Sequence, residues 1–162
     1  ICGAAETLLV HQDVAADMLP AIAADLQKAG CQLRGDSAAK SLISDMQFAN
    51  DDDWRTEYLD AILSVRVVDS IDMAIHHIAR YGSGHTDSII SESDEAGEDF
   101  LNRVDSAIVM RNASTQFADG SEFGMGAEIG IATGRLHARG PVGAAQLTSF
   151  KYVVRGDGQI RS

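Results

Sequence analysis

Residues 1–10 read ICGAAETLLV, a cysteine set among small residues and followed directly by an apolar run. The run from Thr7 to His11 has the length and composition of a strand. Apolar residues then recur at helical spacing from Val14 to Leu26, and Gly30 is placed to end that helix. Residues 31–34 alternate as a second strand. A strand–helix–strand unit of this length predicts parallel pairing across the crossover.

The alternation of strands and helices continues along the chain. Apolar or alternating runs at 62–68, 86–91 and 106–110 predict strands, and Ser70 and Ser93 are placed to cap the helices between them. The sequence therefore predicts an α/β fold with an open, mainly parallel sheet and helices on both faces. In such sheets, ligands bind at the carboxyl ends of the strands.

A polar loop at residues 112–122 follows the predicted strand 106–110. Its amides, hydroxyls and acids suit a binding role at a strand end, but the same residue types also simply shape turns. The glycines of residues 123–130 superficially resemble a dinucleotide fingerprint. We reject that interpretation because a polar loop, and no apolar strand, leads into them. These glycines are expected to allow tight turning or close backbone approach.

Composition bounds the class of protein. At 162 residues, the chain suits one core. A net charge of −11 and a pI near 4.6 argue against binding to a nucleic-acid backbone. No apolar run approaches the roughly 18 residues that cross a bilayer. Two widely spaced cysteines suit a reducing compartment, so a cytoplasmic location is expected.

Cys2 has two interpretations from the residues alone. Free cysteine is often a small buried hydrophobe, which composition favours. Flanking small residues would instead leave the thiol open to a substrate. A cysteine hydrolase would need a basic partner, for which His11 and His85 are the early candidates. The sequence begins at Ile1 without an initiator methionine or a signal peptide, so we expect sequence before Cys2 to be missing.

Two polar clusters have both a structural and a functional interpretation. Asp51, Asp52 and Asp53 invite a metal hypothesis, but hard-cation ligands are usually spaced, so a solvated helix start is expected. His76 and His77 are adjacent, point about 100° apart on a helix and are expected at the surface. No metal site is predicted.

The C-terminal part contains a loop at 139–141 and an alternating run at 149–155. That run predicts a strand close to the terminus, which needs a sheet edge as its partner. The edge would belong either to the same chain or to another subunit.

Several blocks, taken together and in order, closely resemble the gamma-glutamyl phosphate reductase family, also called glutamate-5-semialdehyde dehydrogenase, of the aldehyde dehydrogenase superfamily. The blocks are Cys2 with ETLLV (6–10), LRGD (33–36), DWRTEYLD (53–60), YGSGHT (81–86), NAST (112–115), FGMGAEIG (123–130), HARGP (137–141) and KYVVRGDG (151–158). The resemblance runs from end to end and identifies Cys2 as a catalytic thiol.

The resemblance implies the second step of proline biosynthesis, in which NADPH reduces L-glutamyl 5-phosphate to the semialdehyde and phosphate is released. Cys2 would attack the acyl phosphate to give a thioester, and hydride would then give a thiohemiacetal that collapses to aldehyde and thiolate. A donor for the developing oxyanion is also needed, and the Cys2 amide could supply one.

The resemblance also implies roles for other residues. Glu57 aligns with the superfamily glutamate that binds the nicotinamide ribose, although Leu59 and Asp60 stand where many members have Phe-Gly. Asn112, Ser114 and Thr115 match the loop expected near the amino-acid head of the substrate.

This sequence departs from the family pattern at two further positions. Gly3 replaces a common asparagine and Gln116 a common arginine. The first change removes an amide donor beside the nucleophile, and the second removes a partner for the substrate carboxylate. These departures bear on substrate affinity more than on the reaction class.

We expect a catalytic α/β domain at 1–130 and a returning segment with an oligomerisation strand at 131–162, with the cofactor-binding domain upstream and absent. Homo-oligomers through that strand, and association with glutamate 5-kinase, are the partners that the resemblance suggests. Two alternatives stay open: a dehydrogenase that oxidises a free aldehyde, and a catalytically silent module that mediates self-association.

Overall fold

The computed structural model describes residues 1–162. Strands and helices alternate along most of the chain, as predicted. In order they are β1 (Thr7–His11), α1 (Gln12–Lys28), β2 (Gln32–Gly35), α2 (Ser37–Leu42), β3 (Gln47–Phe48), the 3-10 helix η1 (Asp53–Arg55), β4 (Ile62–Val68), α3 (Ile71–Tyr81), β5 (Thr86–Ile89), α4 (Asp94–Arg103), β6 (Ile108–Arg111), the 3-10 helix η2 (Thr115–Phe117), β7 (Glu128–Ala132), β8 (Gly140–Gly143) and α5 (Ala144–Leu147).

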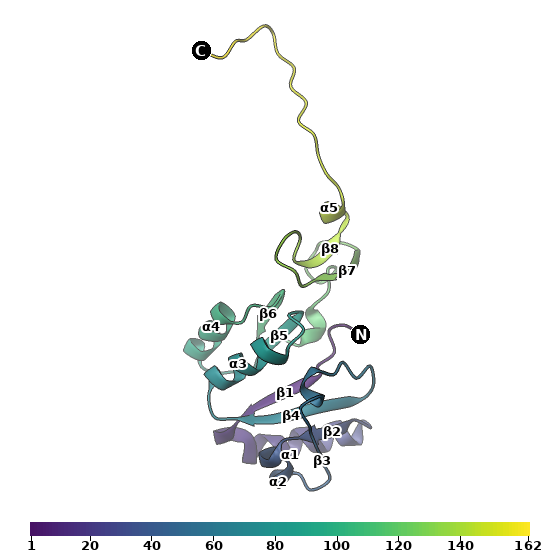
Figure 1. Ribbon diagram of the computed structural model, residues 1–162, viewed down its shortest axis with the longest axis vertical. Coiled ribbons are helices and arrows are strands. Elements are labelled where there is room, and N and C mark those ends of the chain that lie inside the picture. Colours follow the sequence, from purple (N-terminus) through teal and green to yellow (C-terminus); the bar gives the residue numbers. More distant parts are fainter.

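The main sheet contains four parallel strands in the order β1-β4-β2-β3. The central strand β4 pairs with β1 from Ser64 to Val68 and with β2 from Ile62 to Val65. The predicted parallel direction of β1 and β2 is therefore confirmed. They do not pair with each other, however, because the longer and more deeply buried β4 lies between them (Figure 1).

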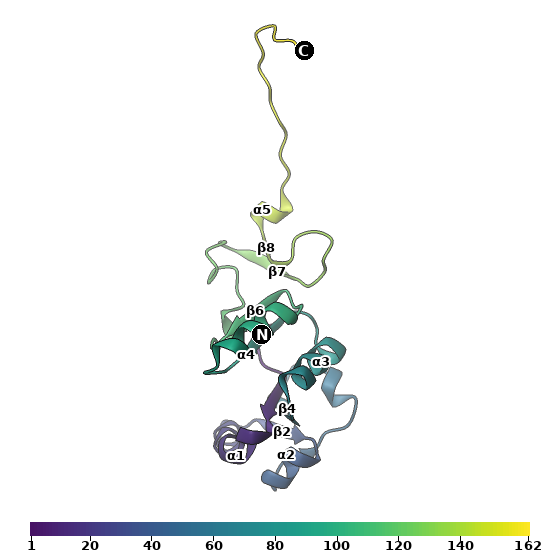
Figure 2. The ribbon, with the colours of Figure 1, turned by 90° about the vertical axis from the view of Figure 1, so that its left-hand side faces the viewer.

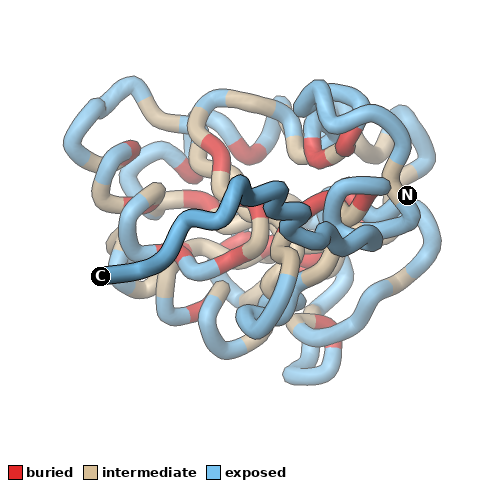
Figure 3. Tube along the Cα trace, turned by 90° about the horizontal axis from the view of Figure 1, so that it is seen from above, coloured by how far each residue is buried: buried red, intermediate tan, exposed pale blue.

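One face of this sheet holds the main hydrophobic core. Helices α1 and α2 cover that face, and the buried residues lie in the interior (Figures 1 and 3). Gly30 follows α1 with a φ of +87°, which confirms its predicted role at the helix end. The core is formed by Val10, Ala15, Leu19, Ala23, Leu33, Ala39, Met46, Leu63 and Val65.

The opposite face of the main sheet is polar and aromatic. Here β4 contributes Ser64 and Arg66, which alternate with the core residues Leu63 and Val65. Asp53 is only 4% exposed and forms an ion pair with Arg34, so the predicted solvated acidic cluster is wrong at this residue.

His77 belongs to the same polar face and is also 4% exposed, which corrects its expected surface position. Its ring packs between Trp54 and Tyr81, and its Nδ1 accepts a hydrogen bond from Arg66. Burial lowers the pKa of His77 to about 4, and the nearby charges of Arg66 and His76 act in the same direction. The ring is therefore neutral near pH 7, while His76 is exposed as predicted.

A second, two-stranded parallel sheet is formed by β5 and β6. Helix α3 contacts β4 and α4, and α4 packs on β6, so these helices lie on the side of the main sheet away from α1 (Figures 1 and 2). The predicted caps are confirmed: the hydroxyls of Ser70 and Ser93 accept hydrogen bonds from the first turns of α3 and α4. The predicted α/β class is confirmed, but the strands are divided among separate sheets.

The segment after β6 differs from the prediction. β7 and β8 form an antiparallel hairpin, and β8 includes residues 140 and 141 of the expected loop at 139–141. Gly124 and Gly126 have φ values of +72° and +77°, which confirms the predicted tight turning of this glycine-rich stretch. The predicted domain division at residue 130 falls inside β7 and stays a prediction.

Residues 148–162 form no helix or strand, so the strand predicted at 149–155 is not formed within this chain. The tail leads away from every sheet edge and is exposed throughout (Figures 1 and 3). A strand without an adjacent edge has no partner for its backbone groups. No helix of the chain combines the length and the apolar composition needed to cross a lipid bilayer.

Candidate active site

Cys2 lies in a turn directly before β1, closed by a hydrogen bond from the Ala4 amide to the Ile1 carbonyl (3.0 Å). The thiol is exposed, so the alternative of a buried core cysteine is wrong. The second cysteine, Cys31, is partly buried, and burial raises the pKa of its thiol. Of the two, Cys2 has the accessibility that a nucleophile needs.

The turn that carries Cys2 is held by η2, more than 100 residues along the chain. The Thr115 hydroxyl donates to the Gly3 carbonyl at 2.6 Å, and Gly3 is buried. A Cβ atom at position 3 would lie 2.8 Å from the Thr115 carbonyl oxygen, so glycine permits this close approach of the two backbones. Thr115 therefore contacts the turn that presents the thiol.

Glu57 lies between η1 and β4, at the amino end of β4, and is exposed. The amino end of the neighbouring strand β1 carries Glu6, whose carbonyl accepts a hydrogen bond from Ser64 N (3.0 Å). Burial raises the pKa of the Glu6 carboxyl, and the charge of Glu57 raises it further. Glu6 and Glu57 thus precede the neighbouring strands β1 and β4, and Glu6 follows Cys2 by four residues.

The other two residues of the expected substrate loop use their side chains within the chain. The Asn112 amide accepts from Ser91 N and donates to Ser91 O, both at 2.9 Å, and its φ is +53°. Asparagine tolerates this left-handed conformation better than most residues. Ser114 is exposed, and its hydroxyl caps η2 by accepting from Gln116 N. Both side chains therefore shape the loop beside Cys2.

The structure thus brings Cys2, Glu57 and loop 112–117 into one region. The amino ends of β1 and β4 supply Cys2 and Glu57, and the carboxyl end of β6 supplies the loop. The predicted site residues thus lie at the carboxyl end of β6 and at the amino ends of strands of the main sheet. An exposed thiol, a flanking carboxylate and a shaped polar loop suit covalent catalysis on a small polar substrate.

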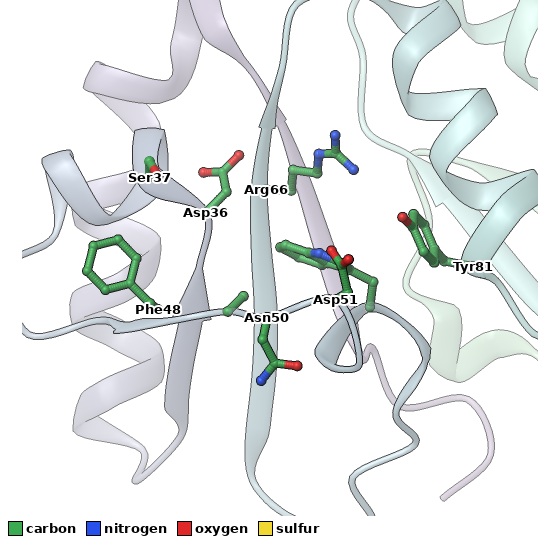
Figure 4. Close-up of a pocket in the computed structure, with 9 residues that line it drawn as sticks. Asp36, Ser37, Phe48, Asn50, Asp51, Arg66 and Tyr81 are labelled. Carbon is green, nitrogen blue, oxygen red and sulfur yellow. The ribbon is translucent and has the colours of Figure 1, made fainter.

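A cavity of about 300 Å³ lies elsewhere, where β2 and β3 end (Figure 4). Asp36, Phe48, Arg66 and Tyr81 face it in the close-up, together with further polar residues. Both carboxylate oxygens of Asp36 already accept backbone hydrogen bonds, from Ala39 and Val67. None of the residues predicted for the active site lines this cavity.

The side chains form no cluster of three or more potential metal ligands. Within the acidic triplet, Asp51 and Asp52 are exposed, whereas Asp53 turns inward to Arg34. The metal hypothesis therefore has no geometric support.

Comparisons with known proteins find relatives of this chain. No family model matches the chain. The chain is 62% identical over 161 residues to the gamma-glutamyl phosphate reductase of Hyphomonas neptunium and 65% identical to that of Caulobacter vibrioides. Each alignment covers 99% of this chain. It covers 38% of the first relative and 39% of the second. The chain thus spans under two fifths of the length of the curated relatives it matches.

Solved structures give the same result. The chain superposes over its full length on the crystal structure of gamma-glutamyl phosphate reductase from Thermotoga maritima, with a TM-score of 0.93, 47% identity and 39% of that chain covered. It also superposes on an acetylating aldehyde dehydrogenase from Geobacillus thermoglucosidasius, with a TM-score of 0.66 and 16% identity. The second match shows the fold alone.

The fold is that of an α/β protein similar to an acetylating aldehyde dehydrogenase, and an exposed cysteine precedes its first strand. Within that class, the chain is a homologue of gamma-glutamyl phosphate reductase, aligned to part of that protein's length. The resemblance stated from the sequence is confirmed.

Sequence reasoning missed the residues that support the site. Glu6 was not singled out, although it follows the cysteine closely in the same block. The Gly3–Thr115 contact joins segments that no local pattern relates. The polar positions Ser64 and Arg66, alternating inside an otherwise apolar strand, were the available signal that the second face of the sheet is polar.

We predict that Thr115→Val lowers the free energy of unfolding by about 1 kcal/mol, because a partly buried hydrogen bond is lost while the shape is kept. Thr115→Ser, which keeps the hydroxyl, is the control and should lose less. Urea unfolding of both variants measures the difference. Equal stability of the two variants would show that the hydroxyl does not hold the Cys2 turn.

Proposed function

We propose that this chain is the cysteine-bearing part of an enzyme of proline biosynthesis that uses NADPH to reduce L-glutamyl 5-phosphate to L-glutamate 5-semialdehyde. The observation that carries the proposal is the identity of 62% to 65%, across 99% of the chain, with proteins named gamma-glutamyl phosphate reductase. The exposed position of Cys2 and the contact of its turn with loop 112–117 support it, and Glu57 precedes the strand that pairs with β1.

Cys2 is the proposed nucleophile. Its thiolate would attack the acyl carbon of the glutamyl phosphate, so that a carbon–sulfur bond forms and phosphate leaves. A thiolate is both a good nucleophile and a good leaving group, which suits it to forming and later releasing the acyl group. The Cys2 amide donates no hydrogen bond within the chain and is free to stabilise the developing oxyanion.

Glu57 is the residue of this chain proposed to hold the cofactor. Its exposed carboxylate offers two acceptor oxygens, which fit the hydroxyl groups of a ribose. When bound, the nicotinamide supplies the hydride that reduces the acyl group. Glu57 would orient the cofactor toward the Cys2 turn, and Glu6 beside it keeps the region negatively charged or, when protonated, offers a further donor. The preference for NADPH is part of the proposal.

Loop 112–117 is proposed to meet the amino-acid head of the substrate. Asn112 and Thr115 would act through the backbone that they fix, since their side-chain groups are already hydrogen-bonded within the chain. Ser114 is exposed and has a hydroxyl proton to donate. A carboxylate or phosphate of the substrate would accept it.

We also propose a cellular compartment and partners for this protein. Two free cysteines suit a reducing, cytoplasmic compartment. The exposed tail is proposed to pair with a sheet edge of another subunit, and association with glutamate 5-kinase would bring the supply of an unstable acyl phosphate close to its use.

The activity is tested in the polypeptide that joins this sequence to the remaining length of its relatives. In the oxidative direction, reduction of NADP⁺ by the semialdehyde should require phosphate, because phosphate is the group that releases the acyl chain from Cys2. Cys2→Ala should lower the rate about a thousandfold or more, whereas Cys31→Ala should leave it within about twofold.

Three results would contradict the proposal. Turnover without phosphate would favour the dehydrogenase that oxidises a free aldehyde and releases the acyl group to water. Unchanged activity of Cys2→Ala would remove this thiol from the mechanism. Absence of activity in the full-length protein would favour the catalytically silent module.

Self-association is tested by sedimentation. The exposed apolar residues of the tail include Phe150, Tyr152 and Val154, which lie at alternate positions suited to one face of a strand. Replacing Tyr152 and Val154 by lysine should lower the assembly mass, whereas Gln159→Lys, beyond the predicted strand, should not. An unchanged mass in the double variant would exclude the tail from the interface.

A further inference from the structure

Glu57 belongs to residues 53–58, a segment called the Glu57 loop below. The side chains at its two ends are hydrogen-bonded to each other. Asp53 precedes Glu57 by four residues and Tyr58 follows it directly, and the Tyr58 hydroxyl donates to Asp53 Oδ1 at 2.7 Å. This hydrogen bond closes a loop of six residues with Glu57 near its end. The exposed carboxylate therefore projects from a segment that is fixed on both sides.

The closed loop is attached to the main sheet at two points. From β2, Arg34 Nη1 donates to Asp53 Oδ1 at 2.6 Å, and its guanidinium lies 5.0 Å from the centre of the Tyr58 ring. From β4, the Ser64 hydroxyl donates to the Tyr58 hydroxyl oxygen at 2.8 Å and lies 3.2 Å from the Asp53 carbonyl oxygen. Ser64 is fully buried and Asp53 nearly so.

The middle of the loop packs against α3. The Trp54 ring meets His77 edge-on at 5.4 Å, and the Arg55 guanidinium lies 4.9 Å from the centre of the Tyr81 ring. After Tyr58 the chain turns through Leu59, whose φ is +52° although it is not glycine. A residue keeps such a conformation only where its surroundings impose it.

We propose that Tyr58, through its hydrogen bonds to Asp53 and Ser64, is a positioning residue that fixes Glu57 for binding of the nicotinamide cofactor. The inference rests on the proposed role of Glu57. A buried polar network whose carboxylate and hydroxyls are hydrogen-bonded sets one geometry where apolar packing would tolerate several. Arg34 completes the network by neutralising Asp53, and none of these side chains needs to touch the cofactor.

The test uses the polypeptide that joins this sequence to the remaining length of its relatives, with NADPH as the probe. Tyr58→Phe removes one hydroxyl and keeps the ring. It should raise the dissociation constant for NADPH about tenfold, while the KM for L-glutamyl 5-phosphate changes less than about twofold. Tyr81→Phe is the matched control, because that tyrosine lies in the same aromatic neighbourhood and its hydroxyl has no hydrogen-bond partner in the chain.

A double-mutant cycle separates positioning from general destabilisation. Glu57→Gln alone should weaken NADPH binding, and Tyr58→Phe added to it should weaken binding no further, because there is no longer a carboxylate to position. Circular dichroism and thermal unfolding establish that each variant is folded at the assay temperature. If Tyr58→Phe folds poorly, Ser64→Ala removes the other hydroxyl and takes its place in the cycle.

The outcomes distinguish the positioning role of Tyr58 from the cofactor-binding role of Glu57. Weaker binding in Glu57→Gln but not in folded Tyr58→Phe would overturn the positioning role and leave the proposed function intact. Additive effects of the two changes would also overturn it. Unchanged NADPH binding in Glu57→Gln would overturn the cofactor role of Glu57, and the positioning role would fall with it.

Discussion

The buried carboxylate of Asp53 is the group on which the candidate site depends. It lies on the polar face of the main sheet, where burial alone would raise its pKa. Hydrogen bonds from the Asn50 amide, Arg34 and Tyr58 outweigh burial and lower the pKa of this aspartate below its ordinary value. An ionised carboxylate can accept several donors at once, so that of Asp53 joins β2 to the Glu57 loop, while the main-chain carbonyl of Asp53 lies within hydrogen-bond distance of Ser64 in β4.

The two faces of the main sheet consequently have different roles. The face toward α1 and α2 is apolar and supplies most of the burial that drives folding. The other face holds the ionic and aromatic network, whose net contribution to stability is small because both charges lose hydration. What this network contributes is a defined geometry. It fixes the loop that presents Glu57 at the same sheet end as the turn with Cys2.

The regular part of the fold could be predicted from the sequence because its signals are local. Strand-length apolar runs, helical spacing and the serine caps at Ser70 and Ser93 determine nearest-neighbour geometry, and these elements form where expected. The order β1-β4-β2-β3 depends on contacts between distant segments, for which no spacing rule exists. The strand expected at 149–155 failed for a related reason, since alternation cannot show whether a partner edge is present.

The candidate site also has residues that the sequence identified and residues that it assigned wrongly. Cys2, Glu57 and the 112–115 loop were identified by their resemblance to a family, and the structure brings them to one region. The burial of Asp53 and His77 was wrongly predicted because charged and imidazole side chains are assigned to the surface unless a partner is known. Their partners, Arg34 in β2 and Arg66 in β4, belong to other elements of the fold, so no local pattern pairs them. The alternation of Ser64 and Arg66 in β4 nevertheless indicated a polar face.

Titration of the Asp53 carboxyl by ¹³C NMR, in protein labelled at aspartate, tests this account most directly. The account predicts a midpoint below the ordinary value of about 3.9, so that Asp53 stabilises the fold above that pH and the contribution is lost as the pH falls through the lowered pKa. A midpoint above the ordinary value would mean that burial outweighs the bonds from Arg34 and Tyr58. The network would then not hold the Glu57 loop as described.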